Sequence, residues 1–357
     1  MAMSPQLLLH LFSLLCIGSN VTQSAKRNIT NSGDLLSTLN TKPEGLPPMS
    51  ENLSGSNPLG DIQASDYMVR LFLRISKSNG QLTNPDAFMG DHIHGFIDND
   101  GSNDSNFTFN VSIPTNEILK SAKLLLYKYP SNHASYSRSS LLVTIHDIYS
   151  GREIASKLVA IQTVGWISFE LPRGIILRWK RKPQTNAGVS VRIAGSPRLT
   201  INAIRFATRQ KNATFQPLIV AYCSVTSSLF AALQRSTVKR VPRDRRSDQS
   251  SHKGKCGLQK LNINFKDLGW DKWVIAPKQY SASYCAGTCL DRYDNTQSNH
   301  ALIQLMMHQE TPGYANAPCC APTQMAPISM LYYGGPGEST YVLKQMKDWV
   351  VTACGCK

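Results

Sequence analysis

Seven of the nine cysteines in this chain lie between residues 256 and 357. They are Cys256, Cys285, Cys289, Cys319, Cys320, Cys354 and Cys356. Such dense cysteines are typical of small exported domains, which disulfides hold together in place of a large apolar core. The pattern therefore predicts a separate disulfide domain at the C-terminal end of the chain.

Two short spacings within this cluster can form a ring. The pattern C-x-x-x-C begins at Cys285 and C-x-C begins at Cys354, so two disulfides between these pairs would close a ring that a third bridge can thread. Gly287 and Gly355 lie inside the ring and, without a Cβ, leave room for the threading chain. Spacing alone leaves the connectivity open, because six cysteines can pair in many ways.

Residues 1–24 have the pattern of a secretory signal peptide. An apolar run from Leu7 to Ile17 precedes the first charged residue, Lys26, and small polar residues follow the run. The run is too short to span a bilayer and no later apolar stretch is long enough, so we expect a secreted chain without a transmembrane segment. A buried N-terminal helix is the alternative.

Seven N-x-Ser/Thr sequons agree with export, because N-glycosylation occurs on secreted proteins. They stand at Asn20, Asn28, Asn52, Asn103, Asn106, Asn110 and Asn212. None follows residue 246, so we expect glycosylation in the N-terminal part of the chain.

Zinc binding is the first alternative for clustered thiols. An exported chain meets oxidising conditions, in which thiols form disulfides, and this chain lacks repeated C-x-x-C pairs. We therefore expect no metal site and no cofactor.

The net charge of +15 suggests nucleic acid as a partner until its location is considered. Residues 247–357 are nearly balanced, with ten Lys and Arg against eight Asp and Glu, whereas residues 235–246 hold six basic residues and one Asp. The excess lies mainly at the junction and is otherwise dispersed, so we expect no nucleic-acid partner.

The rest of the chain predicts one helix followed by many strands. Residues 25–60 are rich in Ser, Asn, Thr, Gly and Pro and are expected to be flexible. Apolar steps of three and four over residues 61–76 predict an amphipathic helix with Asp66 as its cap. Strands are expected at residues 107–113, 124–129, 141–148, 166–171, 189–193, 201–206 and 218–222. This order predicts an antiparallel β-sandwich with a helical arm.

A basic, proline-containing linker joins the two regions and contains Arg243, Arg245 and Arg246 directly before Ser247. Furin-like proprotein convertases favour this pattern, because their acidic subsites attract guanidinium groups. The sequence thus predicts a signal peptide (1–24), a propeptide (25–246) and a mature domain (247–357). A linker that only binds heparan sulfate or matrix is the alternative.

Several stretches together are specific to one family. They are Phe265–Pro277, Tyr284–Cys289, Asn299–Ala301, Cys319–Thr323, Ile328–Tyr333 and Val350–Lys357. With them the C-terminal region resembles the transforming growth factor-β superfamily, nearest its bone morphogenetic protein and growth/differentiation factor branch. Upstream stretches such as Ala64–Met68 and Ala122–Tyr127 look like the propeptide of that family. This resemblance implies that an N-terminal helix and a strand-rich arm domain enclose the growth factor, assist its folding and sometimes hold it latent.

The resemblance implies a mainly β cystine-knot growth factor with two β-fingers and one helix. It implies the pairings Cys285–Cys354 and Cys289–Cys356 for the ring, Cys256–Cys320 through it, and Cys319 bonded to its copy in a second chain. The product would be a homodimer, or a heterodimer with a related ligand. It would assemble type I and type II receptor serine/threonine kinases and activate SMAD signalling.

The resemblance also implies two receptor surfaces on each mature chain. We expect Trp270 and Trp273 to be exposed anchors for a type I receptor. The helix of residues 299–310, capped by Asn299, would complete this surface from the other chain with one stripe of Leu302, Leu305 and Met306. A type II receptor patch would comprise Ala276, Ser329, Leu331 and Leu343. Ordinary core packing is the alternative for these residues.

Other functions and one cysteine remain open. A zymogen fits the cleavage site, but we find no nucleophile motif and expect no enzyme. A secreted cystine-knot antagonist, or an inactive heterodimer subunit, would occupy receptors without signalling. Cys223, in the propeptide, is either a buried thiol or a disulfide link to a second propeptide or to matrix.

Replacing Arg246 tests the cleavage site. Arg246→Ala should reduce release of the mature fragment, because the side chain before the cut occupies an acidic subsite of the convertase. Immunoblots of culture medium measure the ratio of fragment to precursor, with Lys253→Ala, beyond the cut, as a control. An unchanged ratio would place the working cut after Arg240.

Overall fold

The structure is a computed structural model, and it describes residues 64–83, 92–99, 105–131, 139–194, 204–225, 254–291, 298–334 and 340–357. These form an N-terminal region (64–225) and a C-terminal region (254–357). Most elements are antiparallel strands, which confirms the predicted mainly β class. Within the described ranges, no helix is long and apolar enough to cross a membrane.

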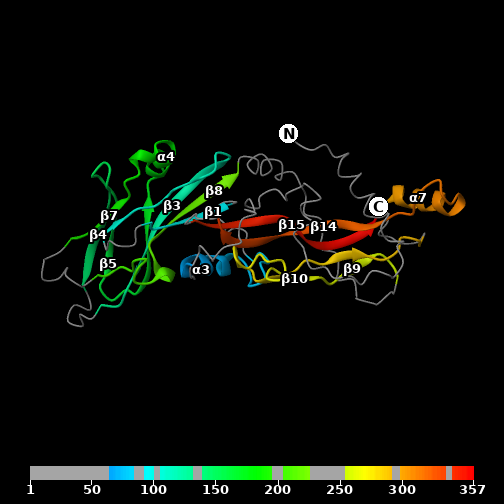
Figure 1. The fold of residues 1–357 in the computed structure, drawn as a ribbon, viewed down its shortest axis with the longest axis horizontal. Helices are drawn as coiled ribbons and strands as arrows, with labels where there is room; N and C mark the ends of the chain where they lie inside the picture. The colour runs from blue at the N-terminus through cyan, green and yellow to red at the C-terminus, as the bar shows by residue number, and fades with distance from the viewer. Residues whose placement is uncertain are drawn as a thin grey trace.

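One seven-stranded sheet runs through both regions (Figure 1). Its order is β11, β14, β15, β1, β8, β3 and β6, and the first three strands belong to the C-terminal region. In that order the strands comprise Val274–Ala276, Cys320–Tyr333, Thr340–Cys356, His92–Ile97, Leu218–Val225, Glu117–Lys128 and Gly165–Leu171. The regions join where β1 pairs with β15, from His92 opposite Lys344 to Phe96 opposite Thr340.

A four-stranded sheet covers the N-terminal part of this large sheet. Its order is β2, β7, β4 and β5, with bounds Asn106–Phe107, Val189–Ala194, Ser140–Asp147 and Glu153–Ala160. Alternate side chains of both sheets form one apolar core, to which helix α4 (Arg173–Arg181) adds Ile176 and Trp179. Two short 3-10 helices, η4 (Pro183–Thr185) and η5 (Ala213–Phe215), lie in the connections. The predicted sandwich is therefore present.

Helix α3 (Asp66–Ile75) lies on the opposite face of the seven-stranded sheet (Figure 1). Its buried residues recur at helical spacing and are Met68, Leu71, Phe72 and Ile75. Asp66 is the first helical residue and not the cap that the sequence predicted. Its carboxylate accepts hydrogen bonds from Arg70 and from Trp166 of β6, which holds the start of the helix against the sheet.

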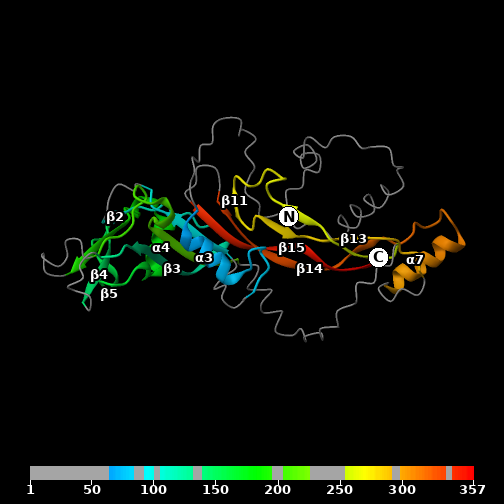
Figure 2. The ribbon, with the colours of Figure 1, turned by 90° about the horizontal axis from the view of Figure 1, so that it is seen from below.

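The C-terminal region is elongated, and α7 (Asn299–Glu310) lies at the end farther from the N-terminal region (Figure 2). Strands β14 and β15 form one long finger. The other finger contains β9, β10, β12 and β13, with bounds Gly257–Gln259, Asn262–Asn264, Gln279–Ser281 and Tyr284–Ala286. Ser298 caps α7 by accepting a hydrogen bond from the Ala301 amide, so the prediction of Asn299 as cap is wrong by one residue.

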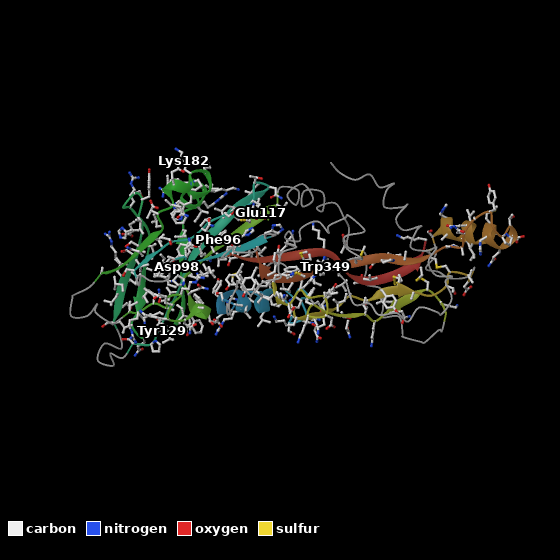
Figure 3. All side chains as sticks on the ribbon, in the orientation of Figure 1. Phe96, Asp98, Glu117, Tyr129, Lys182 and Trp349 are labelled. Atoms are coloured by element: carbon white, nitrogen blue, oxygen red, sulfur yellow. A yellow bond between two sulfur atoms is a disulfide. The ribbon has the colours of Figure 1, made fainter. Side chains whose placement is uncertain are left out.

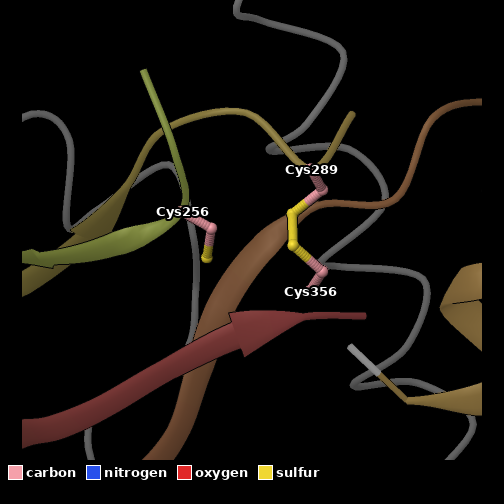
Figure 4. A group of neighbouring side chains, drawn as sticks. All are labelled: Cys256, Cys289 and Cys356. Atoms are coloured by element: carbon pink, nitrogen blue, oxygen red, sulfur yellow. A yellow bond between two sulfur atoms is a disulfide. The ribbon is translucent and has the colours of Figure 1, made fainter. Parts of the chain in front are cut away.

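Three disulfides fasten the base of the two fingers. They are Cys285–Cys354, Cys289–Cys356 and Cys256–Cys320, the pairs that the family resemblance implies. Cys256 lies beside the Cys289–Cys356 bond (Figure 4), and the sulfurs of these three cysteines lie within 4.8 Å of one another. Because all three are oxidised in disulfides, this cluster offers no thiolate to a metal.

Gly287 lies where the threading segment passes through the ring. Its φ is +116°, and a Cβ there would collide with the backbone carbonyl of Lys255 and approach the Cys256 nitrogen to 2.8 Å. Both the backbone conformation and the space therefore require glycine.

Two predicted strands are not strands in the described residues. Side chains of residues 107–113 alternate between buried and partly or fully exposed, but only residues 106–107 pair in a ladder, with an isolated bridge from Phe109 to Asp98. The Asp98 carboxylate accepts a hydrogen bond from the Thr108 amide, so this amide bonds to a side chain and not to a neighbouring strand. Of the strand predicted at 201–206, residues 201–203 lie outside the described residues, and the rest contributes one bridge, between Phe206 and Lys128.

Gly287→Ala should prevent formation of the knot, because the added methyl collides with the threading backbone. Gly254→Ala is a matched control, since Gly254 has a similar φ of +112° but no atom within 4 Å of an added Cβ. The control should cost on the order of 1–3 kcal/mol in backbone strain yet still form the disulfides. Disulfide mapping of the secreted protein measures the cysteine pairing in both variants. A native pairing in Gly287→Ala would contradict the account.

Candidate receptor-binding surfaces

The predicted type II receptor patch lies beneath the N-terminal region. Ser329, Leu331 and Leu343 are fully buried, and Ala276 is partly buried against the same apolar cluster. Leu343 pairs with Leu331 across the finger and with Ile93 of β1 on its other side. The structure thus brings all four predicted residues to one face, but that face is covered.

Helix α3 and the segment after it form the cover. Phe72 and the other buried residues of α3 pack in the cluster that contains Leu331 and Leu343. The amide of Ser65 donates to the Tyr341 hydroxyl at 3.0 Å, and the amide of Ser329 donates to the Gly80 carbonyl at 2.8 Å. Apolar packing therefore covers the centre of the patch, and backbone hydrogen bonds fix its edge.

The family resemblance implied that a helix and a strand-rich domain enclose the growth factor, but the sequence did not predict which surface the helix covers. The apolar stripe of α3 indicated that the helix needs a partner, but a stripe does not say which surface it contacts. The partner includes residues of β15 that lie far along the chain, and the pairing of β1 with β15 brings them under the helix.

Trp270 and Trp273 are half-buried and not freely exposed as expected. Their ring centroids lie 5.2 Å apart, and Trp270 stacks on Phe265 while Trp273 meets Tyr332 edge to face. Trp349, labelled in Figure 3, lies 6.4 Å from Trp270 and was missed by sequence reasoning. The cluster thus combines core packing with partly accessible aromatic faces.

Every described member of this aromatic cluster belongs to the C-terminal region. Its apolar neighbours come from both fingers, and α3 packs in a different cluster. In the described residues, the N-terminal region therefore packs over the predicted type II receptor patch and not over the aromatic cluster predicted for the type I receptor.

Helix α7 presents an apolar outer face. Leu305 is fully buried, Leu302 is half-buried and Met306 is 44% exposed, so the three do not form one exposed stripe as expected. Ile303 and Met307, which sequence reasoning missed, are 61% and 40% exposed. Ala301 packs against the knot, which turns the opposite side of the helix outward. Exposed apolar residues at this density suit a protein contact.

The structure says less about the remaining predicted sites. The cleavage residues 243–247 lie outside the described residues, as do Asn20, Asn28, Asn52 and Asn103. Asn106 and Asn110 are exposed, whereas Asn212 is half-buried and its side chain caps η5 through the Thr214 amide. Cys319 is half-buried, and its backbone pairs with Lys357 at the chain end.

Cys223 is a free and fully buried thiol in the middle of the sheet. Burial, with a smaller contribution from Glu117, raises the pKa of this thiol to about 12. A disulfide to another chain needs an accessible sulfur, so the structure favours the buried-thiol alternative.

Two family models together match most of the chain. The model described as "TGF-beta propeptide" matches residues 5–222, and "Transforming growth factor beta like domain" matches residues 255–356. The first covers helix α3 and both N-terminal sheets, and the second covers the knot and the two fingers.

Comparison with characterised proteins gives relatives of the same kind. Derriere protein of Xenopus tropicalis is 39% identical over 186 residues, which are 50% of this chain and 49% of the relative. Protein DVR-1 homolog of Strongylocentrotus purpuratus is 28% identical over 280 residues, which are 68% and 59%. Bone morphogenetic protein 4 of Mus musculus is 26% identical over 292 residues, which are 75% and 70%.

The matched part of the chain therefore spans between 49% and 70% of the length of these relatives. The propeptide match alone exceeds half of the chain, and the second match coincides with the knotted fingers. This chain belongs to the transforming growth factor-β superfamily, as a growth-factor precursor with its propeptide.

Proposed function

We propose that this precursor is secreted and cut by a furin-like convertase after Arg246 to yield a disulfide-linked dimeric ligand. The ligand would bring together type I and type II receptor serine/threonine kinases and activate SMAD signalling. The observation that carries the proposal is the apolar patch around Leu331 and Leu343, which is formed on the fingers and covered by a segment that cleavage separates covalently from them.

The covered patch has the character of a binding surface. Once α3 leaves, Leu331 and Leu343 would stand on a rigid two-stranded finger, and apolar side chains on such a scaffold make good anchors for a partner. A surface this apolar would be a liability if it were permanently exposed. The propeptide would protect it until a receptor is available.

Cleavage alone would not release the growth factor. Each fully buried apolar side chain of α3 contributes about 1.5–3 kcal/mol, and four such residues pack at this face. The β1–β15 ladder adds backbone hydrogen bonds. We expect the propeptide to stay bound after the cut and to compete with the type II receptor for the same patch.

The dimer would bring α7 of one chain to the aromatic cluster of the other. The exposed Ile303, Met306 and Met307 of α7 would pack beside the half-buried Trp270 and Trp273 of a second chain, so that the two chains together form the type I receptor surface. Cys319, beside the knot, would form the interchain disulfide. A heterodimer with a related ligand would use the same surfaces.

An antagonist is the second candidate. Such a product would bind one receptor class and give no signal, and no structural feature favours it over an agonist. Heparan sulfate or matrix binding by the basic linker would add to either function.

Electrophoresis tests the covalent dimer. The mature product should run as a dimer without reductant and at about half that mass with it. Cys319→Ser should abolish the covalent dimer while sedimentation still detects a noncovalent one, because apolar burial at α7 also holds the chains together. A wild-type product that is monomeric without reductant would contradict the proposed interchain disulfide at Cys319.

Reporter cells for the two SMAD branches test signalling. The purified cleaved dimer should activate one branch, and adding excess isolated propeptide should suppress the response. Leu331→Ala should weaken the response by about 10-fold or more, as expected for an anchor residue. Met325→Ala, on the same strand but 48% exposed outside the patch, is the matched control and should leave the response unchanged.

Secretion and disulfide-linked dimer formation show whether each variant folds. A well-folded Leu331→Ala dimer with full activity would refute the patch. A wild-type dimer that binds receptor ectodomains but activates neither reporter would establish the antagonist.

A further inference from the structure

Two histidines and a glutamate meet on the buried face of the seven-stranded sheet, in the propeptide. The Glu117 carboxylate accepts hydrogen bonds from His92 Nδ1 and from His94 Nε2, each at 2.6 Å. All three side chains are at most 12% exposed. Glu117, labelled in Figure 3, lies at the end of the propeptide nearest the growth factor.

The strand register brings these groups together. His92 and His94 are two residues apart in β1, so both point to the same face, and Glu117 begins β3 on the far side of β8. Between them β8 presents Cys223 opposite His92 and Ala221 opposite His94. These small side chains leave room for the longer ones to converge above them.

The cluster has the donor atoms of a metal site. The imidazole nitrogens and a carboxylate oxygen lie within 4.8 Å of one another. Cys223, opposite His92 on the neighbouring strand β8, is not part of this group of three. Two imidazoles and one carboxylate are a ligand set that zinc takes in proteins.

The burial of Glu117 also favours a cation, because a buried carboxylate needs a compensating charge. Lys344 of the growth factor lies opposite His92 and is half-buried. A divalent ion held by the carboxylate and the two imidazoles would compensate the carboxylate from within the cluster.

We propose that His92, His94 and Glu117 bind a zinc ion. Binding would replace the two histidine–glutamate hydrogen bonds with two zinc–nitrogen bonds and one zinc–oxygen bond. Each imidazole would present a lone pair at the nitrogen that now faces Glu117 and carry its proton on the other nitrogen. Zinc in proteins takes four ligands, so a water molecule would occupy the fourth position of this three-residue site.

The ion would stabilise the strand that holds the growth factor. His92 and His94 belong to β1, which pairs with β15 along residues 340–344. The third ligand, Glu117, belongs to β3, inside the propeptide sheet. Zinc would therefore fix β1 to the propeptide and so strengthen the attachment of the growth factor.

Metal analysis of the intact precursor, made without a histidine tag, tests the proposal. Purified protein dialysed against metal-free buffer should retain about one zinc ion per chain. His94→Gln and Glu117→Gln should weaken zinc binding by at least about 100-fold. His146→Gln, in strand β4 of the other sheet, makes the same chemical change and should leave zinc binding unchanged.

Cobalt substitution keeps the test informative if the buried variants fail to fold. Co²⁺ in the wild-type precursor should give the visible absorption band of a nitrogen- and oxygen-ligated site, and excess zinc should remove it. Zinc, but not magnesium, should raise the wild-type thermal midpoint. A wild-type precursor that retains no zinc, gives no cobalt band and shows no zinc-dependent shift of its thermal midpoint would overturn the proposed zinc site.

Discussion

The pairing of β1 with β15 is the contact on which the arrangement of the whole precursor depends. It joins a strand of the propeptide to a strand of the growth factor in antiparallel register, so that one sheet crosses both regions (Figure 1). Because side chains alternate across a sheet, this register decides which face each residue occupies. It places Leu343 beside Ile93 under α3, and Lys344 beside His92 on the other face.

The two regions are stabilised in different ways. The propeptide has a continuous apolar core between two sheets and needs no disulfide in its described residues. The fingers are narrow, with many half-exposed residues, and three disulfides hold their base. The finger surface near α3 is nevertheless apolar and fully buried. A knotted growth factor can therefore present an apolar surface that the propeptide covers before release.

Several parts of this structure could be predicted from the sequence. Strands β4, β6, β7 and β8 were expected from alternation or apolar runs, and the disulfide pairs were implied by the family resemblance. Strand β5 was missed because it is a sheet edge whose side chains are mostly exposed, so no alternation marks it. Strand β1 was missed because two histidines and a glycine interrupt its apolar pattern.

The missed strand had consequences for the candidate sites. Without β1, neither the position of the cover over Leu331 and Leu343 nor the meeting of His92 and His94 with Glu117 could be predicted. The sequence His-x-His was the available signal, but it carries meaning only on a strand, where both side chains share a face. The inward position of Leu305 also depends on packing near the knot, which the helical period does not specify.

Hydrogen exchange tests the central claim that the propeptide covers the proposed type II receptor patch through α3 and β1. Exchange would be compared, by mass spectrometry, between the intact precursor and the purified mature dimer. The account predicts that the amide of Ser329, and those amides of residues 340–344 that point toward β1, exchange slowly in the precursor and much faster in the mature dimer, because their contacts with Gly80 and β1 are lost. Equal protection in the two forms would contradict it.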